Sequence, residues 1–159
     1  MGLKFAMDAD CLIKLTKAGI KERVCEVWQV CVTQTVRYET VERAPTLPDA
    51  ERIGANIAAG RIVLVPLATP QETKGEDTTL ALYNAGGFDA VATDDARFIR
   101  HLRGLGIPYA VPGVIVVHLR QAGVLTEAEA GRTLAALRPH ISPDEHAASL
   151  LMLSGGRSR

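Results

Sequence analysis

The 159-residue sequence lacks an excess of charge of either sign. Lysine plus arginine and aspartate plus glutamate number 18 each, so the formal net charge at pH 7 is zero. There is therefore no overall basic field of the kind that attracts nucleic acids, and any polyanion must be held by a local group of cations. Aromatic residues make up only 4% of the chain. The single tryptophan, Trp28, adjoins an apolar run and is expected to fill the core rather than to stack on a base.

Cysteines are also few. Cys11, Cys25 and Cys31 are odd in number and none belongs to a CxxC pair, which argues against a disulfide scaffold and against a zinc site. They are typical of reduced thiols, and we expect a cytoplasmic protein. The first residues, MGLKFAMDAD, combine one lysine, a short apolar stretch and acids. This pattern predicts neither a signal peptide nor a membrane-spanning helix.

The composition fits one globular domain. Hydrophobic residues make up 47% of the chain and charged residues 23%, which is enough apolar material for a single core. We predict one domain over residues 1–153. Residues 154–159, SGGRSR, contain no apolar side chain and are predicted to form a disordered tail.

Apolar runs of strand length alternate with stretches of helical period, an order that favours a parallel sheet covered by helices on both faces. Five strands are predicted: Leu3–Met7, Gln29–Val32, Arg61–Leu67, Ala90–Thr93 and Tyr109–Val111. The helices predicted between them are Cys11–Ala18, Ile20–Val27, Thr33–Arg43, Pro48–Ala59, Glu76–Asn84 and Ala96–Leu105.

After Pro112 the pattern changes to helices alone. They are predicted over residues 114–122, 126–137 and 143–153, and two of them begin with a capping box, Thr126 with Glu129 and Ser142 with Glu145. These extra C-terminal helices are expected to pack on the sheet or on a second copy of the chain.

Acidic residues follow two of the predicted strands. Asp8 and Asp10 come after the first, and Asp94 and Asp95 come after the fourth. In an open parallel sheet, ligands bind beyond the carboxyl ends of the strands, where the strand order reverses. Asp10 and Asp95 could each serve only as a helix N-cap, but capping alone does not explain two acids at each of two strand ends.

Two further acids lie at helices. Glu39 is in the middle of one predicted helix, where an exposed position is the simpler interpretation. Glu76 follows Gly75 at a helix start, where the helix dipole favours a carboxylate, and the same explanation covers Asp77. A functional site is indicated by all these acids together, and not by any one of them. A site built from carboxylates, with no nearby His or Cys, suits Mg²⁺ or Mn²⁺.

Several segments together resemble the PIN domain, a fold of metal-dependent nucleases that includes many prokaryotic toxin ribonucleases. The resemblance spans nearly the whole chain and is carried by the segments MDADCLIKL, VRYETV, GEDTTLALYNAGGFDAVATDDARF and VPGVIVVHLRQAGVLTEAEAGRTLAAL. It implies a PIN-like three-layer α/β fold with a central parallel sheet of about five strands. Four residues match the family's metal-binding acids: Asp8, Glu39, Glu76 and Asp95.

The resemblance also implies supporting residues. Asp94 is an additional candidate ligand of the metal, and three residues are candidates for the surrounding shell: Asp10, Thr93 and Asp77. Asp10 departs from the family, which usually has Ser, Asn or Thr at this position. The implied reaction is hydrolysis of RNA phosphodiester bonds with Mg²⁺ or Mn²⁺ as cofactor. The implied partners are an antitoxin protein and a second copy of the chain.

The substrate needs local positive charge. Arg97 and Arg100 follow the Asp pair at helical spacing and are predicted to contact RNA phosphates, and Lys14, on the helix after Asp8, is a similar candidate. The alternative for Arg97, Arg100 and Lys14 is an exposed position on a helix face without a role in RNA binding. For Arg103 this alternative is preferred.

Two alternatives belong to other functional classes. Asp8-Ala9-Asp10 also resembles the DxD signature of haloacid-dehalogenase-type phosphatases, in which Asp8 would be the nucleophile and Asp10 a general acid. Lys74 and the pair Asp94/Asp95 would complete that site. Leu12 departs from that signature, and the immediate start of a helix leaves no room for the usual hairpin flap. The third hypothesis is a non-catalytic binding module with a PIN fold.

Overall fold

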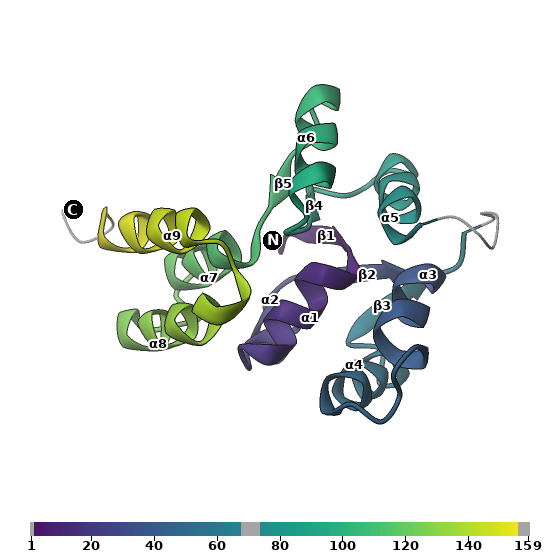
Figure 1. The fold of residues 1–159 in the computed structure, drawn as a ribbon, viewed down its shortest axis with the longest axis horizontal. Coiled ribbons are helices and arrows are strands. Elements are labelled where there is room, and N and C mark those ends of the chain that lie inside the picture. Colours follow the sequence, from purple (N-terminus) through teal and green to yellow (C-terminus); the bar gives the residue numbers. More distant parts are fainter. Residues whose placement is uncertain (1, 68–73, 156–159) are drawn as a thin grey trace.

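Five parallel strands form the centre of the computed structural model, which describes residues 2–67 and 74–155 (Figure 1). The strands are β1 (Lys4–Met7), β2 (Gln29–Thr33), β3 (Ile62–Val65), β4 (Ala90–Ala92) and β5 (Tyr109–Ala110). Their order in the sheet is β3-β2-β1-β4-β5, and every neighbouring pair is parallel. The predicted α/β fold with a parallel five-stranded sheet is confirmed. The chain moves outward from β1 to β3 on one side and continues with β4 on the other, so the strand order reverses between β1 and β4.

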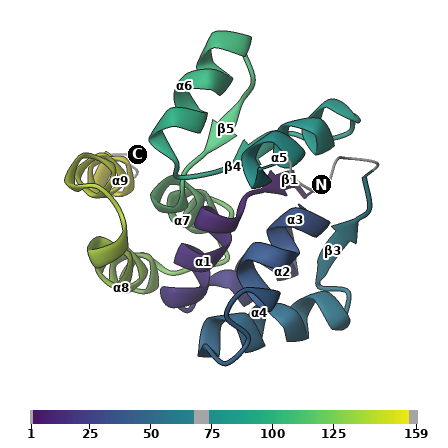
Figure 2. The ribbon, with the colours of Figure 1, turned by 45° about the vertical axis from the view of Figure 1, so that its right-hand side comes forward.

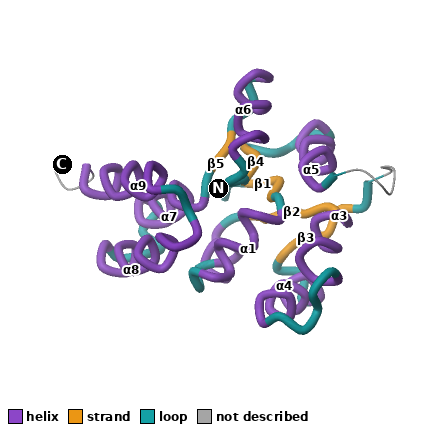
Figure 3. Tube along the Cα trace, in the orientation of Figure 1, coloured by secondary structure: helices purple, strands orange, loops and turns teal. Residues whose placement is uncertain are grey.

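Helices surround the strands on all sides (Figure 3). Those before β4 are α1 (Ala9–Lys17), α2 (Lys21–Val27), α3 (Gln34–Arg37), α4 (Pro48–Ala58) and α5 (Gly75–Asn84). Those after it are α6 (Ala96–Leu105), α7 (Pro112–Gln121), α8 (Glu127–Leu137) and α9 (Pro143–Gly155). In the part of the chain that the structure describes, no helix is both long enough and apolar enough to cross a membrane.

Alternation along the strands gives the sheet two different faces. Phe5 and Met7 of β1 belong to the large core that contains apolar side chains of α1, α7 and α8, whereas Ala6 points to the opposite face, against Leu82 of α5. Val91 of β4 joins a third cluster with side chains of α6. Figure 2 shows α5 and α6 together on one side of the strands, with α1 and α7 on the other. The three layers follow from this alternation of side chains on each strand.

The helix predicted over Thr33–Arg43 is divided. Thr33 caps α3 through its hydroxyl, which accepts a hydrogen bond from the backbone N–H of Val36 at 3.2 Å. The chain then widens into a π-helix, η1 (Tyr38–Glu42), instead of continuing as an α-helix. Such a widening leaves no recognisable pattern in a single sequence, and it is frequent at functional sites. It matters here because Glu39 lies in it.

One of the two predicted capping boxes is complete. At the start of α8, the hydroxyl of Thr126 accepts from the backbone N–H of Glu129, and the carboxylate of Glu129 accepts from the backbone N–H of Thr126. At the start of α9, Ser142 accepts a bond from the N–H of Glu145 at 3.1 Å, but the carboxylate of Glu145 accepts instead from the N–H of Gly113 on α7, also at 3.1 Å. This box was therefore predicted wrongly, since a tertiary donor replaces the local one.

The C-terminal boundary also differs from the prediction. Helix α9 includes Ser154 and Gly155, which the sequence pattern assigned to the tail. The rest of the predicted tail, residues 156–159, lies outside the described residues.

Candidate active site

Asp8 lies where the strand order reverses. Its backbone N–H donates to the carbonyl of Ala92 at 3.0 Å, which ties the end of β1 to the end of β4. One carboxylate oxygen accepts from the N–H of Cys11 at 2.9 Å and so caps α1, and the other accepts from the hydroxyl of Thr93. With only 3% of its surface exposed, Asp8 is a buried acid at the edge of the sheet.

The surroundings of Asp8 disfavour its negative charge. Burial raises the pKa of Asp8 to about 7, although the hydrogen bonds from Thr93 and Cys11 act in the opposite direction. The nearby charges of Asp10 and Glu76 raise the pKa of Asp8 further. A cation close to this carboxylate would compensate both the burial and the repulsion.

Glu76 and Asp95 lie at the starts of the two helices on the same face of the sheet. Asp95 caps α6, accepting from the N–H of Phe98 at 2.8 Å, and its own N–H donates to Thr93 at 3.2 Å. The pKa of Glu76 is raised by partial burial and then by the charges of Asp95 and Asp77. Thr93 thus joins Asp8 and Asp95, and Glu76 lies close enough to interact electrostatically with both of them.

Glu39 reaches the same region from the π-helix. A Cβ atom added to Gly75, the first residue of α5, would lie 2.6 and 2.9 Å from the two carboxylate oxygens of Glu39. The carboxylate therefore packs directly against the backbone that precedes Glu76. The sequence predicts Glu39 on an exposed helix face, whereas the structure places its carboxylate against Gly75 at the start of α5.

Asp94 has a different environment from its neighbour Asp95. Its carboxylate lies 2.5 Å from the ammonium nitrogen of Lys14, which is also 3.1 Å from a carboxylate oxygen of Asp10. Partial burial opposes the charge of Lys14, yet Asp94 and Asp10 together raise its pKa above the usual value. Lys14 thus already has two carboxylate partners, and its predicted role in RNA binding has no support from this arrangement.

Sequence reasoning missed Glu145. Its carboxyl group shares a hydrogen bond with Asp94 and accepts from Gly113, and burial together with Asp94 raises the pKa of Glu145 to about 8. The capping pattern with Ser142 predicts a local role for Glu145, so the sequence does not indicate its contacts with Asp94 and Gly113.

We expect the Lys14→Met variant to lose about 1–2 kcal/mol of unfolding free energy, because the largely buried carboxylate of Asp94 would lose the cation that pairs with it. The loss is smaller than for a fully buried pair, since Lys14 is partly exposed. Urea denaturation at pH 7 measures it. The matched control is Lys17→Met, which removes an exposed pair with Asp49 and should cost less than about 1 kcal/mol. Equal losses in the two variants would show that the cluster around Lys14 is unimportant for stability.

A groove of about 410 Å³ adjoins the acids on the side of α5 and α6. Its lining includes Glu76, Asp77 and Arg97, three residues that the sequence had assigned to the site. It also includes Lys74 and His101. Arg100 is exposed on α6 and is not part of the lining, and Arg103 donates to the hydroxyl of Tyr109 at 2.8 Å.

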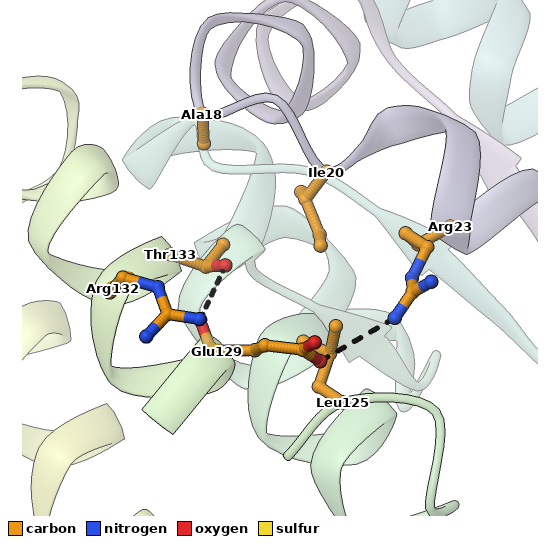
Figure 4. Close-up of a pocket in the computed structure, with 7 residues that line it drawn as sticks. All are labelled: Ala18, Ile20, Arg23, Leu125, Glu129, Arg132 and Thr133. Atoms are coloured by element: carbon orange, nitrogen blue, oxygen red, sulfur yellow. Dashed lines mark hydrogen bonds and ion pairs between the residues drawn. The ribbon is translucent and has the colours of Figure 1, made fainter. Parts of the chain in front are cut away.

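Two other hollows contain none of the four principal acids. One, of about 500 Å³, lies between α6 and α9 and has Asp94 and Glu145 in its wall. The other, of about 330 Å³, lies between the α1–α2 turn and α8 (Figure 4). There Arg23 pairs with Glu129 at 3.5 Å and donates to the carbonyl of Val124 at 2.9 Å. Ile20 contributes an apolar part of the lining.

The donor chemistry around Asp8 fits a hard divalent cation, because every candidate ligand is a carboxylate and neighbouring acids raise the pKa of Asp8 and of Glu76. Within residues 2–67 and 74–155, however, no three His, Cys, Asp or Glu side chains already lie close enough to hold a metal ion. Binding of a cation would therefore have to draw a third carboxylate towards Asp8.

The site thus contains a buried aspartate, a threonine that holds it, and acids from two helix starts and a π-helix. Its interpretation depends on this geometry, because no model of a known protein family matches the chain and no curated protein matches it.

Proposed function

We propose that this protein is a PIN-like ribonuclease that hydrolyses RNA phosphodiester bonds with the help of Mg²⁺ or Mn²⁺. The observation that carries the proposal is the position of Asp8, a buried carboxylate at the switch point of the sheet whose charge is disfavoured by burial and by neighbouring acids. A buried carboxylate with an unfavourable charge at such a position is typical of sites that bind a metal cation or a substrate.

Asp8, Glu39, Glu76 and Asp95 are the residues that would hold the metal. When bound, a divalent ion supplies positive charge that stabilises the phosphoryl oxygens as negative charge develops on them. Thr93 fixes the orientation of Asp8 by donating its hydroxyl hydrogen, and it accepts from the backbone of Asp95, so one side chain positions two of the acids. Gly75 allows the carboxylate of Glu39 to approach the start of α5.

The phosphatase alternative receives less support. Helix α1 begins at Ala9, immediately after Asp8, which leaves no segment for a hairpin flap. Both oxygens of Asp8 also accept hydrogen bonds, one from Cys11 and one from Thr93. These two donors fix the orientation of the carboxylate, as donors around a metal ligand commonly do.

A toxin role with a cognate antitoxin, a cytoplasmic location and a homodimer belong to the same proposal. Pairing of two chains is supported by three large apolar side chains that α9 exposes: Leu150, Leu151 and Met152. An exposed apolar stretch of this kind is a common feature of protein interfaces.

The direct test is incubation of the purified protein with a mixed pool of RNA in the presence of Mn²⁺, with EDTA as the control. We expect cleavage with Mn²⁺ and none with EDTA. A phosphate monoester, p-nitrophenyl phosphate, is supplied in parallel and should remain intact. Release of p-nitrophenol, or covalent trapping of Asp8 by beryllium fluoride, would instead favour the phosphatase. If neither substrate is cleaved, the non-catalytic module becomes the preferred interpretation.

A further inference from the structure

We infer that the groove between α5 and α6 binds the phosphate backbone of an RNA strand next to the acidic site, through Lys74, Arg97 and His101. This inference rests on the proposed function and identifies the side of the site from which the substrate strand extends. It adds Lys74 and His101 to the RNA-binding residues and removes Arg100 from them.

The three basic side chains come from two elements that meet at the acids. Lys74 directly precedes α5, at its N-cap position, while Arg97 and His101 are four residues apart on α6 and so lie on the same face of that helix. All three line the same groove as Glu76. Lys74 and Arg97 are close enough to Glu76 to oppose the rise of its pKa.

These side chains are available for a ligand. Lys74, Arg97 and His101 are exposed, and within the described residues their side chains make no hydrogen bond or ion pair. Several basic residues elsewhere on the surface are engaged: Lys14 with Asp94, Lys17 with Asp49, Arg23 with Glu129, Arg37 with Glu42, and Arg103 with Tyr109. Exposed arginines such as Arg43, Arg52 and Arg100 also make no ion pair within the described residues, but none of them lines this groove. Lys74, Arg97 and His101 therefore lie together in one groove beside the acids, without an ion pair to any residue that the structure describes.

The groove offers contacts to phosphates but none to bases through stacking. Its aromatic residue, Phe98, is only 3% exposed and packs in the core with Leu102 and Val91. Binding of single strands through bases usually relies on exposed aromatic rings, whereas Lys and Arg contacts to phosphates carry no sequence information. We therefore expect binding in this groove to depend little on the RNA sequence.

The acids of the groove do not prevent this binding. Glu76 and Asp77 offset part of the positive charge of the groove. Glu76 is one of the residues that would hold the divalent cation in the proposed function. Without a cation the exposed Lys74 and Arg97 can still contact phosphates, and a cation bound there would strengthen this binding by offsetting the charge of Glu76.

The experiment measures binding separately from cleavage. Fluorescein-labelled oligouridine and oligoadenosine of equal length are titrated by fluorescence anisotropy with the Asp8→Asn protein, and the titration is repeated with wild-type protein in EDTA. We expect Arg97→Ala, added to either background, to weaken binding about tenfold for both RNAs, as expected for loss of a charge-assisted contact. The slope of log K against log salt should fall by about 0.7.

Lys74→Ala and His101→Ala should weaken binding in the same direction. Arg100→Ala is the matched control, because it removes an equal charge from the same helix outside the groove and should leave binding within about twofold. Equal losses for Arg97→Ala and Arg100→Ala, or no loss for either, would overturn the inference. Cleavage of RNA by the wild-type protein in Mn²⁺ is scored independently, so a failure of the groove and a failure of the ribonuclease proposal give different results.

Discussion

Replacing Asp8 by Asn should abolish Mn²⁺-dependent RNA cleavage and at the same time make the protein more stable at pH 8. Activity is lost because the amide cannot supply the negative charge that a divalent cation needs. Stability rises because the amide removes a buried charge, while its oxygen can still accept from the N–H of Cys11 and cap α1. The displacement of the pKa of Asp8 from 3.8 to about 7 corresponds to at most about 4 kcal/mol, and we expect about 2 kcal/mol after loss of the strong bond from Thr93.

The gain in stability should depend on pH in a defined direction. The pKa of Asp8 in the folded protein, about 7, lies above its unfolded value of 3.8, so the folded state holds the proton more tightly. The stability that this proton contributes is complete below about pH 3.8 and is lost as the pH rises through about 7. The difference between Asp8→Asn and wild type should therefore be small at pH 4 and largest at pH 8.

Urea denaturation at a series of pH values checks this expectation. Asp144→Asn is the control, since it makes the same chemical change at an exposed acid in the first turn of α9, where no burial penalty is relieved. A stability difference between Asp8→Asn and wild type that is the same at pH 4 and pH 8 would contradict the assigned environment of Asp8. Retained cleavage by Asp8→Asn would remove Asp8 from the chemistry.

The strands and most helices could be predicted because their patterns are local. The run from Phe5 to Met7 alternates between two buried faces, and the run from Ala90 ends at the Asp pair, so both the sheet and the positions of the acids at its edge followed from the sequence. Parallel strands bring their carboxyl ends to one edge whatever the details of packing. This is why Asp8 and Asp95 could be expected to lie near each other.

The remaining features depend on contacts between distant segments. The pairing of Lys14 with Asp94 and the reach of Glu145 to Gly113 are set by the way α1 and α9 pack near the start of α7, and no local pattern encodes them. The different surroundings of Arg97 and Arg100 also depend on tertiary packing. Both have suitable spacing from the acids, but only Arg97 faces α5.

The structure gives Gly75 a role that the sequence alone does not indicate, because the carboxylate of Glu39 packs against it. A methyl group there would lie 2.6 Å from one carboxylate oxygen of Glu39, so Gly75→Ala must displace Glu39 or the start of α5. We expect cleavage to fall about 100-fold, because a shift of about 1 Å in a group that positions the reaction costs that much. We also expect a loss of at most about 1 kcal/mol in unfolding free energy, because the methyl displaces the end of a flexible side chain and alanine is the better helix former. Cleavage assays in Mn²⁺ and urea denaturation measure the two effects.

Gly131 supplies the matched control, since it lies inside α8 and an added Cβ would meet no atom within 4 Å. Gly131→Ala should raise stability by about 0.5–1 kcal/mol and leave cleavage unchanged. The cause of the Gly75 effect is then tested with Glu39→Ala. If the clash is with the carboxylate, adding Gly75→Ala to Glu39→Ala should cost little or no stability, because the group that the methyl displaces is gone, while activity stays low. An undiminished cost in the double variant would mean that Gly75 is required by the backbone of α5 itself, and that Glu39 is not held against the site in the way the structure indicates.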